Sequence, residues 1–239
     1  MRTYVRTRRI NMRKPGSVGQ ETAKLIRQHA VALIAAHGYA AMNLRQLAEG
    51  VDLTVGSLYN HIGSKQDLLK GLLKAVMEDL LAAVEERVLP YSTPIMQFQA
   101  FVQLHLQFHI DRKNDVLIAT TELRSLSAIN LHHIIKLRNR YEATLGSILR
   151  RGKATRVFNV RDVKFTTLAI IPMLTGVSQW YRPGGRLSRE RLIEEYTSIC
   201  LALVGADRKA EFDPTLLAKI DDEGRPADFG AVPRRRIPQ

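Results

Sequence analysis

The strongest constraint on the fold is the stretch from residue 43 to residue 65, which reads NLRQLAEGVDLTVGSLYNHIGSK. Its first part has the apolar spacing of one helix face, through Leu44 and Leu47, and Asn43 just before is a favourable N-cap. Asp52 stands where the chain must turn sharply, and aspartate tolerates the left-handed backbone conformation better than most residues. The pattern predicts two short helices joined by a tight turn.

The second helix is expected over residues 55–62, with Thr54 as its cap. Leu58 and Ile62 fall on its inner face. The outer face gathers small, aromatic and hydrogen-bonding residues, namely Val55, Ser57, Tyr59, Asn60 and His61. Such a face on the second of two crossed helices is typical of helix-turn-helix DNA readers. The alternative, a purely structural hairpin, would be expected to show Glu and Lys there.

Charge is concentrated around this stretch. The formal net charge is +13 over 239 residues, and residues 1–70 hold 11 basic but only 4 acidic side chains. A polyanion-binding surface requires such a local excess, so double-stranded DNA is the expected partner. Basicity alone would also fit RNA, a membrane surface or an acidic protein.

Residues 23–73 resemble the DNA-binding domain of TetR-family transcriptional repressors, through the motifs HGYAAM, LRQLAEGV and GSLYNHIGSKQDLL. In that family the positions of Tyr59 and Lys65 bind phosphates, and those of Val55 to Ser57, Asn60 and His61 face the major groove. The predicted DNA-binding set is therefore Arg45, Thr54, Val55, Gly56, Ser57, Tyr59, Asn60, His61 and Lys65. Asp52 and Val55 depart from the family's usual Gly and Lys or Gln, so we expect Val55 to contact a thymine methyl rather than a base-edge hydrogen-bonding group.

The rest of the chain is expected to be all-α, without strands. The anticipated helices cover residues 21–37, 65–89, 95–110, 116–126, 131–151 (capped by Asn130), 163–181 (kinked at Pro172) and 189–204. The predicted divisions are a basic N-terminal arm (1–20), a helix-turn-helix domain (21–66), a ligand-binding and dimerisation domain (67–206) and a polar tail (207–239) with a short helical turn near 214–220. The arm could follow phosphates or enter a minor groove; a solvated tail or a misassigned start codon is the alternative.

The family resemblance also implies a homodimer formed by the last two long helices. Segments 163–181 and 189–204 agree, because they hold more apolar residues than one helix face needs within a monomer. A twofold dimer favours a palindromic operator.

The preceding helices are expected, by the same resemblance, to enclose a small-molecule inducer. The candidate pocket residues are Phe98, Phe101, His105, Phe108, His109, Leu123 and Trp180, although aromatic residues at helical spacing are also typical of a core. The sequence QWYRPGGRLS, from residue 179, resembles members that respond to fatty acyl-CoA or related CoA thioesters, so the expected inducer is an acyl-CoA or another hydrophobic compound. Arg124, Arg138 and Arg182 are candidates for the CoA phosphates.

Other chemistries have less support. His105 and His109 share a helix face, but no nearby Cys or carboxylate completes a metal site. Glycine-rich phosphate loops, nucleophile elbows and HExxH motifs are missing, so we expect neither catalysis nor a cofactor. Cys200 is the single cysteine and is expected to be a buried, inert thiol. Without a secretory signal or an apolar run of membrane-spanning length, the expected location is the cytoplasm, with no membrane partner.

The sequence thus predicts a dimeric transcriptional repressor that leaves its operator when an inducer binds. Three alternatives remain open at this point. They are an architectural DNA-binding protein that ignores ligands, a ligand-responsive activator, and a small-molecule enzyme built on a helical domain.

Overall fold

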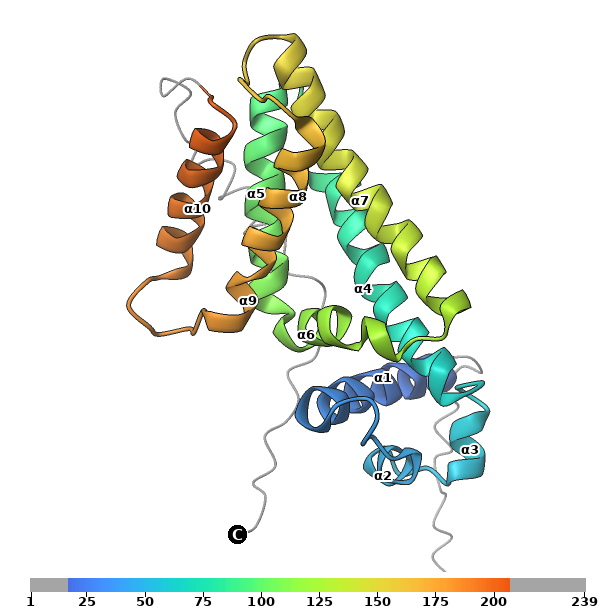
Figure 1. Cartoon of the computed structure of the whole chain (residues 1–239). Helices are drawn as coiled ribbons and strands as arrows, with labels where there is room; N and C mark the ends of the chain where they lie inside the picture. Colours follow the sequence, from blue (N-terminus) through green and yellow to red (C-terminus); the bar gives the residue numbers. More distant parts are fainter. Residues whose placement is uncertain (1–16, 207–239) are drawn as a thin grey trace, which may run out of the picture.

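The computed structural model describes residues 17–206, and every regular element in that range is a helix. Three helices form an N-terminal unit at one end of the molecule: α1 (Ser17–His37), α2 (Leu44–Gly50) and α3 (Val55–Tyr59). The long helix α4 (Lys65–Arg87) rises from this unit into the rest of the protein (Figure 1). The all-α fold class predicted from the sequence is confirmed.

The C-terminal unit is a bundle around one central helix. Its elements are α5 (Pro94–Asp111), α6 (Lys113–Thr121), the 3-10 turn η1 (Glu122–Ser125), α7 (Ala128–Ala154), α8 (Val163–Thr175), α9 (Val177–Trp180) and α10 (Arg189–Leu203). Helix α5 packs against α4, α7, α8, α9 and α10, and Figure 1 shows it between α10 on one side and α4 with α7 on the other. Glutamine and histidine side chains on α5 are therefore buried along with its apolar ones.

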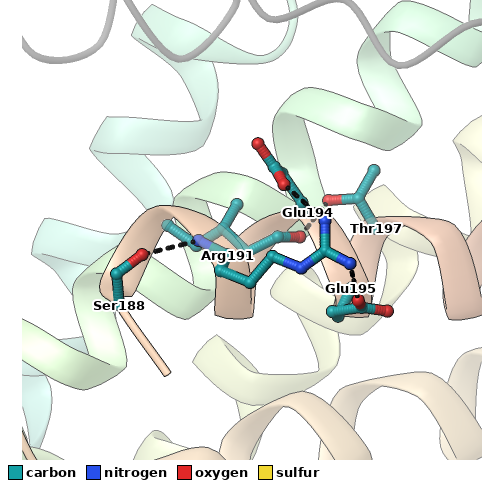
Figure 2. Close-up of polar contacts among 6 residues, drawn as sticks. Ser188, Arg191, Glu194, Glu195 and Thr197 are labelled. Carbon is teal, nitrogen blue, oxygen red and sulfur yellow. Dashed lines mark hydrogen bonds and ion pairs between the residues drawn. The ribbon is translucent and has the colours of Figure 1, made fainter. Parts of the chain in front are cut away.

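Short polar side chains fix where the helices begin. Each accepts a hydrogen bond from a backbone amide in the first turn, as N-caps do, and the capping residues are Asn43, Thr54, Ser64, Thr93, Ser127, Asp162 and Ser188. Figure 2 shows the start of α10, where Oγ of Ser188 accepts from the amide of Arg191 at 3.2 Å. The Arg191 guanidinium then pairs with Glu194 and Glu195 on the outer face of the same helix.

Several helix boundaries differ from the sequence-based expectation; the helix expected over 116–126, for example, is α6 over Lys113–Thr121 followed by the 3-10 turn η1. Helix α7 begins at Ala128 because Ser127, not Asn130, is its cap. The segment expected as one kinked helix over 163–181 ends as α8 at Thr175 and resumes as α9 after Gly176. Proline 172 has no amide hydrogen, so the last turn of α8 is weakened there and the chain changes course within one turn. The helix expected over 55–62 is α3, which ends already at Tyr59.

Two hydrophobic cores share α4. One joins α1, α2 and α3 to α4, α6 and the start of α7, and contains Leu47, Leu58 and Leu69. The other fills the bundle around α5 and contains Phe98, Phe101 and Leu145. Because α4 contributes to both cores, the N-terminal unit and the bundle are packed together rather than linked by a flexible segment. The predicted basic arm (apart from residues 17–20), the polar tail and its helical turn lie outside the described residues.

None of the helices described is both long and apolar enough to cross a membrane.

Candidate DNA-binding surface and ligand cavity

The turn between α2 and α3 is closed by backbone hydrogen bonds. The amide of Leu53 donates to the carbonyl of Ala48 at 2.9 Å, and Asp52 adopts φ 54°. That value lies in the left-handed region, which an aspartate can occupy at modest cost. The sequence-based expectation for Asp52 is confirmed, and it explains how this chain manages without the family's usual glycine.

One face of α3 is turned to solvent. Leu58 is fully buried and Ile62, just beyond the helix, is nearly so, which fixes the rotation of α3 about its axis. Val55 and Tyr59 remain 37% and 49% exposed. The remaining outward positions are exposed or half-buried, and we call the whole set the reader face: Val55, Gly56, Ser57, Tyr59, Asn60 and His61. The predicted outer face is the one that the structure exposes.

Thr54 and Ser57 are hydrogen-bonded to each other at the start of this face. Oγ1 of Thr54 accepts from the amide of Ser57 at 3.1 Å and donates to its hydroxyl oxygen at 2.9 Å. The Ser57 hydroxyl therefore keeps its own proton for a further acceptor. Within the protein, Thr54 therefore acts as the N-cap of α3.

The two predicted basic contacts are placed differently. Arg45 is highly exposed on α2, with Nε 3.7 Å from Glu49 on the next turn. Lys65 folds back onto the N-terminal unit, where Nζ donates to the carbonyl of Ala40 at 3.1 Å and lies 4.7 Å from the centre of the Tyr39 ring. Neither Tyr39 nor Ala40 was predicted to hold Lys65, because 25 residues separate Ala40 from it in the chain.

A hydrogen-bonded joint connects the N-terminal unit to the bundle. The amide of Tyr39 donates to Oε1 of Glu122, and Gln66 reaches both the carbonyl of Ser125 (2.7 Å) and the amide of Ser127 (3.0 Å). Gln66 also donates to the hydroxyl of Tyr39. The joint thus ties the loop before α2 and the start of α4 to η1 and the start of α7.

A cavity of about 350 Å³ lies inside the bundle, between α4, α5, α6, α7 and α8. Its apolar wall includes Val76, Met77, Leu80, Val116, Leu168 and Ile171. Its polar wall includes Thr120, Arg138, Tyr141, Glu142, Thr175 and Gln179. This size and mixture are those of a small-molecule site.

Three of the seven predicted pocket residues line this cavity: His105, Phe108 and His109. The structure does not bring the other four to it. Phe98 and Phe101 are fully buried in the bundle core, where Phe98 packs on Phe158 and Phe101 on Tyr141. Leu123 packs against the N-terminal core, and Trp180 is half exposed against Tyr196. Apolar periodicity marks a buried helix face but cannot tell a filled core from a cavity, which depends on neighbouring helices.

His105 is fully occupied by protein partners. Nδ1 lies 2.9 Å from the Tyr141 hydroxyl, and Nε2 lies 3.1 Å from Oγ1 of Thr175, which is also 2.9 Å from the carbonyl of Ile171. One arrangement gives every donor an acceptor: Tyr141 donates to Nδ1, Nε2–H donates to Thr175, and Thr175 donates to Ile171. Burial raises the pKa of Tyr141 and lowers the pKa of His105, so both stay neutral. The network pins α5 to α7 and α8.

His109 stacks on His105, with ring centres 3.8 Å apart. Its Nδ1 lies 2.7 Å from the carbonyl of His105. Since a carbonyl only accepts, Nδ1 carries the proton. Burial, the main cause, and the nearby charge of Arg138 together lower the pKa of His109 to about 4, although the hydrogen bond to the His105 carbonyl acts in the opposite direction. At neutral pH the ring is uncharged, and Nε2 is an acceptor.

Arg138 brings a charge to the cavity wall. Its Nη2 donates to the carbonyl of Ala119 at 2.9 Å. Burial lowers the pKa of Arg138 and the nearby Glu142 raises it, but the guanidinium stays protonated. Of the three arginines considered for a ligand, Arg138 alone lines the cavity within the described residues; Arg124 is exposed on η1 and Arg182 donates to the carbonyls of Gln179 and Tyr181.

A second, open hollow of about 700 Å³ runs between α7 and α8. It shares Glu142 and Leu168 with the cavity, so the two are adjacent. Its basic side chains are Arg150, Arg161 and Lys164. The cavity therefore adjoins a surface that carries three basic side chains, together with Glu142 and Asp162.

A metal centre has no basis in the part of the chain that the structure describes. No group of three or more His, Cys, Asp or Glu residues in that part could hold an ion. Cys200 is buried, and burial raises the pKa of its thiol to about 12, so the thiolate is not accessible at neutral pH.

Two family models match the chain. The model for bacterial regulatory proteins of the tetR family matches residues 26–72, and the model for the tetracyclin repressor-like C-terminal domain matches residues 91–204. The HTH-type transcriptional repressor KstR2 of Mycobacterium tuberculosis (strain H37Rv) is 26% identical over 191 residues, covering 79% of this chain and 95% of that protein. KstR2 of Rhodococcus jostii (strain RHA1) is 24% identical over 188 residues, covering 78% and 91%.

Solved structures share the fold. A tetR-family regulatory protein from Rhodococcus RHA1 superposes with a TM-score of 0.73 at 25% identity, covering 78% of this chain and 98% of that one. The ketosteroid transcriptional regulator KstR2 of Mycobacterium tuberculosis gives a TM-score of 0.68 at 25% identity, covering 79% and 95%. AibR, in complex with isovaleryl coenzyme A and operator DNA, gives 0.70 at 20% identity, covering 77% and 99%.

Proposed function

The chain belongs to the tetR family of transcriptional regulators, and from this premise we propose that it represses transcription as a homodimer released from its operator by a small-molecule inducer. The observation that carries the proposal is the reader face. The burial of Leu58 and Ile62 fixes this face toward solvent. The face presents small, aromatic and amide side chains on an exposed helix. The proposed DNA-binding domain is residues 21–66, with 67–206 binding the ligand and the second subunit.

Each part of the reader unit has a distinct role in this proposal. Ser57, Asn60 and His61 read base edges, and Val55 contacts a thymine methyl. Tyr59 and Lys65 bind phosphates, and Arg45 reaches the DNA from α2. Lys65 must exchange its contacts with Ala40 and Tyr39 for a phosphate, or extend from them, when DNA arrives.

Exposed apolar side chains on α8 and α10 support the dimer. Phe165 is 71% exposed, and Leu168, Ile199 and Leu203 are about half exposed, whereas the other large apolar residues of these helices are buried or half-buried within the monomer. Large apolar side chains left exposed together mark a protein interface. Pairing α8 and α10 with their symmetry mates would cover them and set two α3 helices toward successive major grooves.

The cavity supports a ligand with a substantial apolar part. A coenzyme A thioester fits this picture if its acyl group enters the cavity and its phosphates lie outside, near Arg150, Arg161 and Lys164. AibR, a protein of the same fold, holds isovaleryl coenzyme A, and the similar KstR2 is described as a ketosteroid regulator. We therefore propose an acyl-CoA or another hydrophobic compound as the inducer.

Coupling between the two sites would pass through α6. Val116, Ala119 and Thr120 of this helix line the cavity, α6 packs on α1, and η1 at its end carries the joint to Tyr39 and Gln66. An inducer acts only if it binds the DNA-incompetent arrangement more tightly than the DNA-bound one. A ligand that displaces α6 meets this condition.

Operator binding of the full chain tests the proposal. Fluorescence anisotropy with duplexes from the region upstream of the protein's own gene, and with shuffled duplexes at matched salt, should show specific, salt-dependent binding. Adding acyl-CoAs, fatty acids, steroids and aromatic compounds should identify one that releases the DNA. Equal affinity for every duplex would instead indicate an architectural DNA-binding protein, and reporter output that rises with bound protein would indicate an activator.

A further inference from the structure

The cavity wall carries one buried side chain with an unused hydrogen-bonding atom. His109 is more than nine-tenths buried and lines the cavity. Its Nδ1–H is committed to the carbonyl of His105, and this is the one hydrogen bond that the His109 side chain makes within residues 17–206, so Nε2 is left without a protein donor. The Nε2 lone pair therefore receives no hydrogen bond from the protein, and water or a ligand must supply the donor.

Three neighbouring polar side chains, His105, Tyr141 and Thr175, are already hydrogen-bonded to one another. His105 uses both ring nitrogens, and Thr175 gives its proton to the carbonyl of Ile171. Tyr141 gives its proton to His105. A ligand hydroxyl that enters the cavity thus meets His109 as the imidazole acceptor still open to it.

Arg138 supplies hydrogen-bond donors on the wall of the same cavity. The guanidinium has five N–H donors, and the carbonyl of Ala119 accounts for one nitrogen. Glu142 lies one turn along α7, where its charge raises the pKa of Arg138, and it lines both the cavity and the open hollow. Arg138 is therefore a partly buried cation whose remaining donors call for oxygen atoms of a ligand.

We propose that the inducer is an apolar hydroxyacyl compound, whose hydroxyl donates to Nε2 of His109 and whose carboxyl or carbonyl oxygen accepts from Arg138. This inference rests on the proposed function and names the chemical class of its ligand. Both residues line one cavity of about 350 Å³, so a single molecule can contact both, with its apolar body against α4, α6 and α8. A plain hydrocarbon or an amine would leave one or both groups unpaired.

Calorimetry on the full chain without DNA tests the assignment. The probes are decanoate, 3-hydroxydecanoate and methyl 3-hydroxydecanoate, with a matched set on a cyclohexyl-substituted butanoyl body. The hydroxy acid should bind roughly fivefold or more tightly than the acid without the hydroxyl, as expected for one buried hydrogen bond. If the hydroxy acid binds more tightly than its methyl ester, the natural inducer is a free acid. If the ester binds as tightly as the acid or more tightly, the natural inducer is an acyl conjugate.

Two substitutions separate the two contacts. In His109→Phe the preference for the hydroxyl should disappear, while the matched exposed change His132→Phe should keep it. Arg138→Met should weaken the binding of the hydroxy acid and of its ester by roughly tenfold or more but leave the preference for the hydroxyl. Arg138→Lys should recover part of the lost affinity. The ¹⁵N resonance of His109 Nε2 in the unsubstituted protein should shift with the hydroxy compounds only, which gives a readout free of folding defects.

The assignment is overturned if the hydroxyl makes no difference in the unsubstituted protein, if its effect survives in a folded His109→Phe, or if no hydroxy compound binds. Failure of the proposed function has a different signature. In that case the hydroxyl preference would persist in calorimetry, but no ligand would alter binding to operator DNA.

Discussion

The backbone amide of Tyr39 donates a hydrogen bond to Oε1 of Glu122 at 3.2 Å, although 83 residues separate them in the chain. Glu122 directly follows α6, which lines the cavity through Val116, Ala119 and Thr120, and Tyr39 precedes α2 and supports Lys65 with its ring. The contact is therefore a short physical path from the ligand cavity to the DNA-binding surface. Gln66 reinforces it through Ser125 and Ser127.

Replacing Gln66 by Ala should destabilise the protein. The substitution leaves the partly buried carbonyl of Ser125 without its partner, which costs roughly 1–3 kcal/mol, while the exposed amide of Ser127 can turn to water. Urea denaturation followed by circular dichroism measures the change. The same substitution at exposed Gln46 is the control and should alter stability by less than about 0.5 kcal/mol. Equal effects at both positions would show that the joint contributes nothing.

Replacing Lys65 by Ala should weaken binding to all duplexes alike. The loss of one phosphate contact should reduce the slope of log affinity against log salt by about 1. Anisotropy titrations over a series of salt concentrations measure it, with Lys74→Ala as the control, since Lys74 pairs with Glu78 on the exposed side of α4. An unchanged salt slope would exclude a phosphate contact by Lys65.

Replacing Asn60 by Ala should change which sequences are preferred. Asn60 is exposed on the reader face, and an amide can make two hydrogen bonds to an adenine edge. We expect a loss of roughly 1–3 kcal/mol for the cognate site and little loss for unrelated duplexes. Selection from a random duplex library compares the sequence preferences of the variant and the unsubstituted protein. Gln46→Ala is again the control. A uniform loss across all sequences would assign Asn60 to the backbone instead.

Replacing Phe165 by Asp should produce monomers. A charge at a side chain that the proposed dimer covers would be desolvated without a partner, at a cost of several kcal/mol. Sedimentation velocity at micromolar concentration measures the assembly state. Ile129→Asp is the matched control, because Ile129 on α7 is similarly exposed, at 73%, but lies outside α8 and α10. A dimer that survives Phe165→Asp would place the interface elsewhere.

Stability should fall in acid because of His109. Its pKa is about 4 in the folded protein against an ordinary 6.5, so the unfolded chain binds the proton more readily. The contribution of His109 to the free energy of unfolding is fully present above pH 6.5. It is lost as the pH falls toward 4, and the loss for this group amounts to roughly 3 kcal/mol. Denaturation at a series of pH values measures it. His109→Gln should reduce the slope of the profile between pH 6.5 and 4 and leave the part due to His105, whose pKa burial also lowers, whereas His132→Gln, on an exposed part of α7, should leave the slope unchanged.

Most of the N-terminal unit could be predicted from the sequence because its determinants are local. The caps at Asn43 and Thr54 lie within three residues of the amides that they bind. The left-handed turn at Asp52 and the inward face of Leu58 follow from backbone sterics and helical periodicity. A local rule also placed Pro172 at a distortion, although it did not predict the break at Gly176.

The tertiary structure alone decided which side chains meet across the bundle. Phe98 and Phe108 share one helix and similar apolar character, yet Phe98 fills the core against Phe158 while Phe108 lines the cavity. The contact between Tyr39 and Glu122 likewise joins residues far apart in the chain. Sequence by itself determined the helices, their caps and the exposed face of α3, since these depend on neighbours within a few residues. The cavity, the open nitrogen of His109 and the joint depend on how distant helices pack, and no local pattern encodes that.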